Sequence, residues 1–198
     1  DGSQGLASAL NKARDAEGDI IVFLSSDDIL LPNALEQITK EFEDNPDLKL
    51  LLRPYYWFEK DWTKPLRKTK YSNYQIEDLI FLTGQLSGIA VKKDVLNYAF
   101  QEKRFVEFAS GVLPIIRDYE SKVGKETVAI RIDSSEARTK GVYDNSPALN
   151  WSTTIRQVFW QNPQLCAYMN RKIGSNYIGF IQIRSYGGIV PTLREIAI

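Results

Sequence analysis

The sequence predicts an α/β fold in which an open, mostly parallel β-sheet is flanked by helices and followed by a helical C-terminal extension. One observation is the apolar, largely β-branched run at residues 20–24, which is typical of a strand buried on both faces. Another is the helical spacing of Leu35, Ile38 and Phe42 after Pro32, which predicts a helix over residues 33–45. The third is composition, because 198 residues with 43% apolar content can bury a core as one domain.

Two acidic residues lie in the turn between the predicted strand and helix. Ligands of open α/β sheets bind beyond the carboxyl ends of the strands, and Asp27 and Asp28 follow such an end. Two carboxylates about 4 Å apart repel by about 4 kcal/mol at an effective dielectric of ~20, so a cation is expected beside them. Mg²⁺ or Mn²⁺ suits carboxylates combined with phosphate oxygens. The alternative is that Asp27 or Asp28 caps the following helix.

The residues around this turn resemble a known family. A helix led by Gly5 and containing Asn11 precedes a Gly-Asp-hydrophobic strand, which ends in the acidic turn and a Pro-led helix. This order and spacing resembles the central part of family 2 glycosyltransferases of the GT-A fold, specifically over residues 5–45 and more generally over residues 46–135. The resemblance implies a metal-assisted, inverting enzyme of polysaccharide biosynthesis. Such an enzyme moves a sugar from a nucleotide-diphosphate sugar to a saccharide or lipid-linked acceptor.

The resemblance also implies roles for single residues of the turn. Asp27 matches the metal ligand of the family's Asp-x-Asp motif, which predicts Mn²⁺ or Mg²⁺ as the cofactor. Ser25 stands where the family has the first Asp of that motif, and this lowers the expected charge. Ser25, Ser26 and Asp28 are expected to bind substrate. Asn11 is expected at the donor site, with a solvent-facing polar residue of its helix as the alternative.

The catalytic base is the least defined part of the predicted site. Many members of the resembling family place a Glu-Asp pair at the entry to a helix, and that pair is missing here. Glu107 is the nearest acid and the candidate base, with a surface or capping residue as the alternative. Asp118 and Glu120 are further candidates. Because the sequence has no histidine, histidine-based acid–base chemistry and Ser-His-Asp triads are excluded.

Three more residues are expected at the substrate. The backbone at Gly88 matches the family's sugar pocket, although a glycine in a strand by itself indicates only a close approach. Arg138 lies in a loop after the last predicted strand and is expected to hold the donor diphosphate as a bidentate clamp. Trp151 just after this loop completes an arrangement that resembles some relatives.

The remaining elements follow from periodicity and from turn residues. Strands are expected over residues 48–58, 86–91 and 127–132, and helices over residues 74–82 and 92–100. A further helix is expected to begin near Ser110, because Pro114 is tolerated only in a first turn. Residues 151–170 are expected to be helical with a break at Pro163. We divide the chain into a partial GT-A core at 1–135 and a loop with a helical extension at 136–198.

Charge and cysteine content limit the classes of partner. The 25 basic and 25 acidic residues cancel, which argues against a nucleic-acid-binding surface. The single Cys166 excludes an intrachain disulfide framework and is compatible with a reducing compartment. No secretory leader and no membrane span is predicted. We therefore expect a cytoplasmic protein, with possible peripheral contact at the inner face of a membrane through residues 173–198.

Two features favour a rival from another class. Ser25 in the Asp-x-Asp motif and the missing Glu-Asp pair are compatible with a non-catalytic carbohydrate-binding or scaffold module of the same fold. The sequence also begins without the donor-binding strands that the resembling family has before its Gly-led helix. We therefore expect the chain to begin inside the domain, and to hold a nucleotide poorly by itself.

Overall fold

The computed structural model describes residues 5–26, 28–53, 55–58, 67–68, 86–102, 106–124, 129–132 and 147–171. In chain order its elements are α1 (Leu6–Asn11), η1 (Lys12–Asp15), β1 (Ile20–Val22), β2 (Ile29–Leu30), α2 (Ala34–Glu43), β3 (Leu50–Leu52), β4 (Tyr55–Phe58), β5 (Arg67–Lys68), β6 (Ala90–Lys92), η2 (Lys93–Val95), α4 (Glu107–Asp118), β7 (Ser121–Val123), β8 (Ala129–Ile132) and α5 (Pro147–Val158). Residues 163–171 are also helical.

The first sheet has the strand order β1-β6-β3-β7. Strand β6 lies between β1 and β3 and is antiparallel to both, whereas β3 and β7 are parallel. Strands β1, β3 and β7 therefore point in the same direction. We call the edge at which they end the carboxyl edge, and the opposite one the amino edge.

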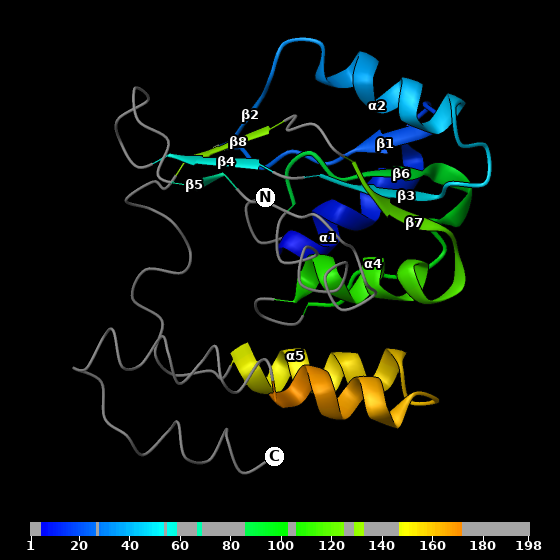
Figure 1. The fold of residues 1–198 in the computed structure, drawn as a ribbon, viewed down its shortest axis with the longest axis vertical. Helices are drawn as coiled ribbons and strands as arrows, with labels where there is room; N and C mark the ends of the chain where they lie inside the picture. The colour runs from blue at the N-terminus through cyan, green and yellow to red at the C-terminus, as the bar shows by residue number, and fades with distance from the viewer. Residues whose placement is uncertain are drawn as a thin grey trace.

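The second sheet has the order β2-β8-β4-β5. Strand β8 is parallel to β4 and antiparallel to β2, and β5 is antiparallel to β4. Because β4 follows β3 and β8 follows β7 along the chain, the second sheet lies beyond the carboxyl edge of the first (Figure 1).

The first sheet separates two apolar cores. Helix α2 covers one face, where Ile38 and Phe42 pack with Leu51 and Ala90. Helices α1 and α4 cover the other face, and α5 lies outside α4 (Figure 1). Leu50 and its alternate neighbour Leu52 point to this second side, as the period of two in a strand requires. Residues of the C-terminal helices, including Ile155 and Met169, are buried in the same cluster.

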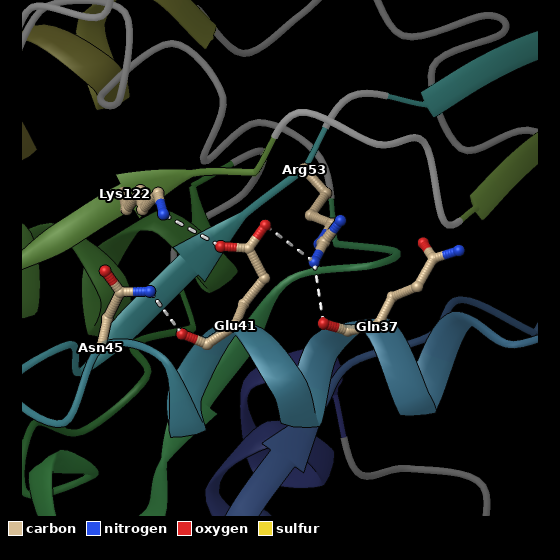
Figure 2. A network of polar contacts seen from close by, with 5 residues as sticks. All are labelled: Gln37, Glu41, Asn45, Arg53 and Lys122. Atoms are coloured by element: carbon tan, nitrogen blue, oxygen red, sulfur yellow. Dashed lines mark hydrogen bonds and ion pairs between the residues drawn. The ribbon is translucent and has the colours of Figure 1, made fainter.

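A polar network fixes α2 on the first sheet near the carboxyl edge (Figure 2). The carboxylate of Glu41 on α2 forms ion pairs with Lys122 of β7 at 3.0 Å and with Arg53 at 3.5 Å. Arg53 follows β3, is buried, and also donates to the main-chain oxygen of Gln37 at 3.3 Å. The charge of Glu41 thus offsets that of a buried guanidinium, since an unpaired buried charge is costly.

The α/β class is confirmed, but the prediction of a mostly parallel sheet is wrong for the described strands. Four of the six described strand pairings are antiparallel. In addition, β1 is half-buried at one side of the described sheet rather than buried on both faces. The reason is that hydrophobic periodicity reports burial and carries no information on the direction of the neighbouring strand.

Several predicted boundaries also differ. Residues 48–58 form two strands in two sheets, with Arg53 between them. Strand β6 begins at Ala90, and the expected helix over 92–100 is only the short η2, which leaves Phe100 free to reach the core. Leu35 is 56% exposed, and Ala34 takes the buried place on α2.

The predicted start of the helix near Ser110 is wrong as well. Helix α4 begins at Glu107, where the hydroxyl of Ser110 donates to the Glu107 main-chain oxygen at 2.7 Å, and Pro114 lies inside the helix.

The helix after the acidic turn, the strand within 127–132 and the helical break before Pro163 are confirmed. The predictions for residues 74–82 and 173–198 lie outside the described residues. Within the described part of the chain, each helix is too short or too polar to cross a membrane.

Candidate functional site

The acidic turn lies at the junction of the two sheets. It leaves the carboxyl end of β1 in the first sheet and enters β2, which pairs with β8 in the second (Figure 1). A side chain in this turn is therefore offered to the space beyond the carboxyl edge, where α/β sheets bind ligands. This placement follows from the strand order and needs no assumption about the ligand.

Hydrogen bonds give the turn a fixed shape. The main-chain N–H of Asp28 donates to the main-chain oxygen of Ser25 at 3.1 Å, which closes a four-residue turn. The N–H of Ser25 donates to Oγ of Ser87 at 2.9 Å, and this hydroxyl in turn donates to Oδ2 of Asp28 at 2.5 Å. Ser87 is 3% exposed, so the hydroxyl that orients the Asp28 carboxylate is shielded from water.

Gly88 allows Ser87 to reach the turn. Its φ of 81° lies in the left-handed region, which a residue with a Cβ rarely adopts. Its N–H donates to the oxygen of Phe23 at 3.1 Å, while the N–H of Phe23 donates to Ile89 at 2.9 Å. The β1–β6 pairing thus continues to Phe23. Gly88 itself lies just before β6, and its contact with a sugar stays a prediction.

Asn11 has described partners within the protein. Its Nδ2 donates to the main-chain oxygen of Phe100 at 3.0 Å, and its Oδ1 accepts from the Phe100 N–H at the same distance. The amide thereby ties α1 to the segment before α4, and neither the solvent-facing alternative nor the donor site explains these contacts. A role of Asn11 at the donor stays a prediction.

Glu107 is the first residue of α4 and is 3% exposed. The next residue, Phe108, packs edge-to-face on Phe23 with the ring centroids 5.0 Å apart. Phe23 lies two residues before Ser25, so α4 begins at the carboxyl edge, on the side of the acidic turn.

The other candidate bases are remote from this turn. Asp118 ends α4 just before β7 begins, and it therefore lies at the amino edge. There it pairs with Arg117. Glu120 also precedes β7, and its main-chain oxygen accepts from Lys49. Asp118 and Glu120 therefore lie at the end of the first sheet opposite the acidic turn.

The structure does not bring all predicted residues together. Asp27 and Arg138 lie outside the described residues, Ser26 is exposed in the turn, and Trp151 on α5 packs half-buried against the core on the α4 side. The proposal that Asp28 caps α2 is wrong, because the N-cap is Asn33 with a φ of 61°. Within the described residues, no group of three or more His, Cys, Asp or Glu could hold a metal ion.

The donors at the turn nevertheless fit a hard divalent ion. Carboxylates and water are the ligand types that Mg²⁺ and Mn²⁺ prefer; the sequence puts the Asp27 carboxylate in this turn, and the neighbouring hydroxyls of Ser25 and Ser26 can bond to metal-bound water. An ion held through one carboxylate of the protein and phosphate oxygens of a substrate needs no cluster of three acids.

Ser87 is the site residue that the sequence did not reveal. It lies 62 residues from Ser25 in the chain, and only strand pairing brings it to the turn. Its one signal is that it directly precedes Gly88, because a glycine with a positive φ often shapes the backbone at a binding site.

Together, the fold and the turn define an α/β protein with a polar site where the carboxyl edge of one sheet meets a second sheet. Residues 1–97 match the family model described as glycosyl transferase family 2, and this part of the chain belongs to that family. The match spans α1, the acidic turn, α2 and the Ser87–Gly88 segment. No curated protein matches the chain. Family membership implies a glycosyltransferase with a nucleotide-sugar donor and an acceptor.

Proposed function

We propose that this protein transfers a sugar from a nucleotide-diphosphate sugar to a hydroxyl group of a saccharide or lipid-linked acceptor, with inversion at the anomeric carbon, in the cytoplasm. The observation that carries the proposal is the family 2 match, because the matched residues include the hydrogen-bonded acidic turn at the carboxyl edge. This turn is the described feature best suited to a diphosphate and its counter-ion.

In this proposal the donor diphosphate lies at the acidic turn. Asp27 holds Mn²⁺ or Mg²⁺, which when bound supplies positive charge for the departing diphosphate. Asp28 shapes the turn, because Ser87 and the main chain of Ser25 fix its carboxylate and its N–H. Ser25, Ser26 and Gly88 contact the donor through hydroxyl and main-chain groups. Arg138 adds a clamp on the diphosphate, in the proposal, and Asn11 supports the donor pocket.

Transfer is a single displacement in which Glu107 is the base. The acceptor oxygen attacks the anomeric carbon while its proton passes to the Glu107 carboxylate. The bond from that carbon to the diphosphate oxygen breaks on the opposite face, its electron pair leaves with the diphosphate, and the configuration inverts. Support comes from the position of Glu107 at the start of α4, whose neighbour Phe108 packs on Phe23 at the carboxyl edge.

Binding and turnover of nucleotide sugars by the whole chain test this proposal. Calorimetry with Mn²⁺ and a panel of nucleotide-diphosphate sugars measures donor binding, and mass spectrometry of added oligosaccharides measures transfer. We expect Asp27→Asn to weaken donor binding at least about tenfold. Glu107→Gln should keep the Kd for the donor but lower kcat by about 10²–10⁴-fold. Asp94→Asn is the matched control, because Asp94 is an exposed acid paired with Lys49.

Two results would contradict the proposal. Equal donor binding by the wild type and Asp27→Asn would remove the metal site from the acidic turn. Full transfer by Glu107→Gln would remove Glu107 as the base. Saccharide binding without any response to nucleotide sugars would instead favour the non-catalytic module, which Ser25 and the missing Glu-Asp pair support.

A further inference from the structure

A groove lies at the end of the molecule opposite the acidic turn. It has a volume of about 570 Å³ and lies between the end of α4 and the turn that joins α5 to the helical residues 163–171. Asp118, on its wall, ends α4 shortly before β7 begins at the amino edge, whereas the acidic turn follows β1 at the carboxyl edge. The groove is therefore separate from the proposed transfer site. Its volume is in the range of about 300–1,000 Å³ that is usual for small-ligand sites.

The most unusual residue of the groove is Trp160, which is 69% exposed. Tryptophan is on average highly buried, so an exposed one in a concave site needs a reason. Its backbone is held on both sides. The N–H of Phe159 donates to Ile155 at 2.8 Å, and that of Asn162 donates to Phe159 at 2.8 Å. The side chain is thus presented on a turn anchored by the buried Phe159.

Polar side chains on the walls add hydrogen-bonding groups. The Asp118 carboxylate accepts from Nε of Arg117 at 2.6 Å, from Nη2 of Arg117 at 2.5 Å, and from the Tyr98 hydroxyl. Since a carboxylate has about four acceptor positions, one remains for a ligand hydroxyl. Asn162 uses its Oδ1 to accept from the N–H of Leu165 at 3.0 Å, which directs its amide NH₂ elsewhere. Gln161 also lines the groove.

This combination suits a sugar. An aromatic face packs on the C–H face of a sugar ring, while carboxylate and amide groups bond its hydroxyls. A membrane surface fits less well, because Arg117 and Asp118 pair on the wall and leave no excess positive charge to attract anionic headgroups, and because a groove does not insert into lipid. We propose that the groove at Trp160, Asp118 and Asn162 is a saccharide-binding site that holds a glycan independently of the transfer reaction.

Glycan binding by the full chain tests this inference. Neutral, amino and acidic oligosaccharides of three to six sugars are titrated against the protein by calorimetry, without nucleotide sugar. We expect at least one of them to bind. Trp160→Ala should weaken this binding about tenfold or more, while Trp160→Phe, which keeps an aromatic face, should retain most of it. Tyr168→Ala is the matched control, because it removes a 36% exposed aromatic residue outside the groove.

Circular dichroism and thermal unfolding verify that each variant is folded. The inference is overturned if no oligosaccharide binds, or if Trp160→Ala and Tyr168→Ala weaken binding equally. A second experiment measures how much protein sediments with vesicles of phosphatidylglycerol. The inference is also overturned if Trp160→Ala lowers this co-sedimentation but leaves oligosaccharide binding unchanged. Asp27→Asn separates the two proposals. It should leave this glycan binding unchanged even if it abolishes donor binding, and Trp160→Ala should leave donor binding unchanged.

Discussion

At the scale of single residues, Ser87 connects the fold to the chemistry. Its buried hydroxyl accepts from the N–H of Ser25 and donates to the carboxylate of Asp28. Ser87 lies in the segment before β6, so a part of the chain distant in sequence fixes the position of the turn. Side chains that orient the ligand-contacting residues often matter as much as those residues themselves. They restrict the conformations of the contacting residues before the ligand binds, so less conformational entropy is lost on binding.

Replacing Ser87 by alanine should therefore affect both activity and stability. We expect Ser87→Ala to lower kcat/KM by about 10–100-fold, the usual effect of losing such a partner. Its free energy of unfolding should fall by about 1–3 kcal/mol, because two groups lose a buried bond. Ser152→Ala is the control, since Ser152 of α5 is also buried and its hydroxyl forms a hydrogen bond with the side-chain amide of Asn170 at 2.8 Å. A loss of kcat/KM shared by both variants would contradict a specific role of Ser87.

The cluster of Tyr98, Arg117 and Asp118 predicts a pH dependence. The hydrogen bonds from Arg117 hold the pKa of the Asp118 carboxyl below its usual value, and the Asp118 hydrogen bond raises the pKa of Tyr98. Because the pKa of Asp118 is lowered on folding, its contribution is present above the unfolded value of about 4 and is lost as the pH falls through the folded pKa. The contribution of Tyr98 is present below about pH 10 and is lost as the pH rises through its folded pKa.

Urea unfolding between pH 2.5 and pH 7, about the range over which carboxyl groups titrate, measures the acid side. The wild type should lose more stability on acidification than Asp118→Asn, and the two curves should converge at the acid end. Asp94→Asn removes an exposed acid for comparison. Parallel curves for the wild type and Asp118→Asn would show that Asp118 has the same pKa in the folded and unfolded chains.

At the scale of elements, helix α4 is deeply buried although it contains two residues that disfavour a helix. It contains Gly111 and Pro114, both poor residues for a helix interior, yet its residues from Glu107 to Ile116 are buried. The reason at Gly111 is a close approach, since an added Cβ would lie 2.5 Å from the Phe100 ring. That ring stacks on Phe108 with the centroids 5.9 Å apart, so it is confined by the aromatic cluster next to the acidic turn.

Replacing Gly111 by alanine therefore tests whether the steric cost of an added Cβ exceeds the gain in helix propensity. In an open helix, Gly→Ala stabilises by about 1 kcal/mol. Here we expect Gly111→Ala to destabilise by about 1–3 kcal/mol, because overpacking moves a ring that has little room. Gly18→Ala should change stability little, since the nearest atom to its added Cβ is 3.6 Å away. Chemical denaturation of both variants gives the comparison, and a stabilised Gly111→Ala would mean that Phe100 has another place to go.

At the scale of the whole molecule, the sequence predicts those features that depend on residues close together in the chain. The acidic turn, the helix that places Ile38 and Phe42 on the sheet, and the break before Pro163 depend on neighbours within a few residues. The direction of β6 and the contact of Ser87 with the turn depend on strand order, which periodicity does not encode. The contact of Asn11 with the main chain of Phe100, 89 residues away in the chain, is likewise not encoded by local patterns.

The division between residues 135 and 136 came from composition, and the packing leads to a different expectation. Ile155, Leu165 and Met169 are buried in the same cluster as Leu113 of α4 and Leu50 of β3. A core shared in this way makes the unfolding of its parts cooperative, because opening the C-terminal helices exposes apolar surface on α4 as well. We therefore expect the described helices of residues 147–171 to unfold together with the sheet.

Met169→Ala makes this expectation measurable, since Met169 is fully buried. We expect it to lower the free energy of unfolding of the whole chain by about 2–5 kcal/mol through the cavity it leaves. The decrease should be the same by far-ultraviolet circular dichroism and by amide exchange in β3 and β6. Gln164→Ala, at an exposed position of the same helical stretch, should have little effect. If exchange accelerated only in residues 147–171, these helices would be an independently folding unit, and the boundary at residue 135 would stand.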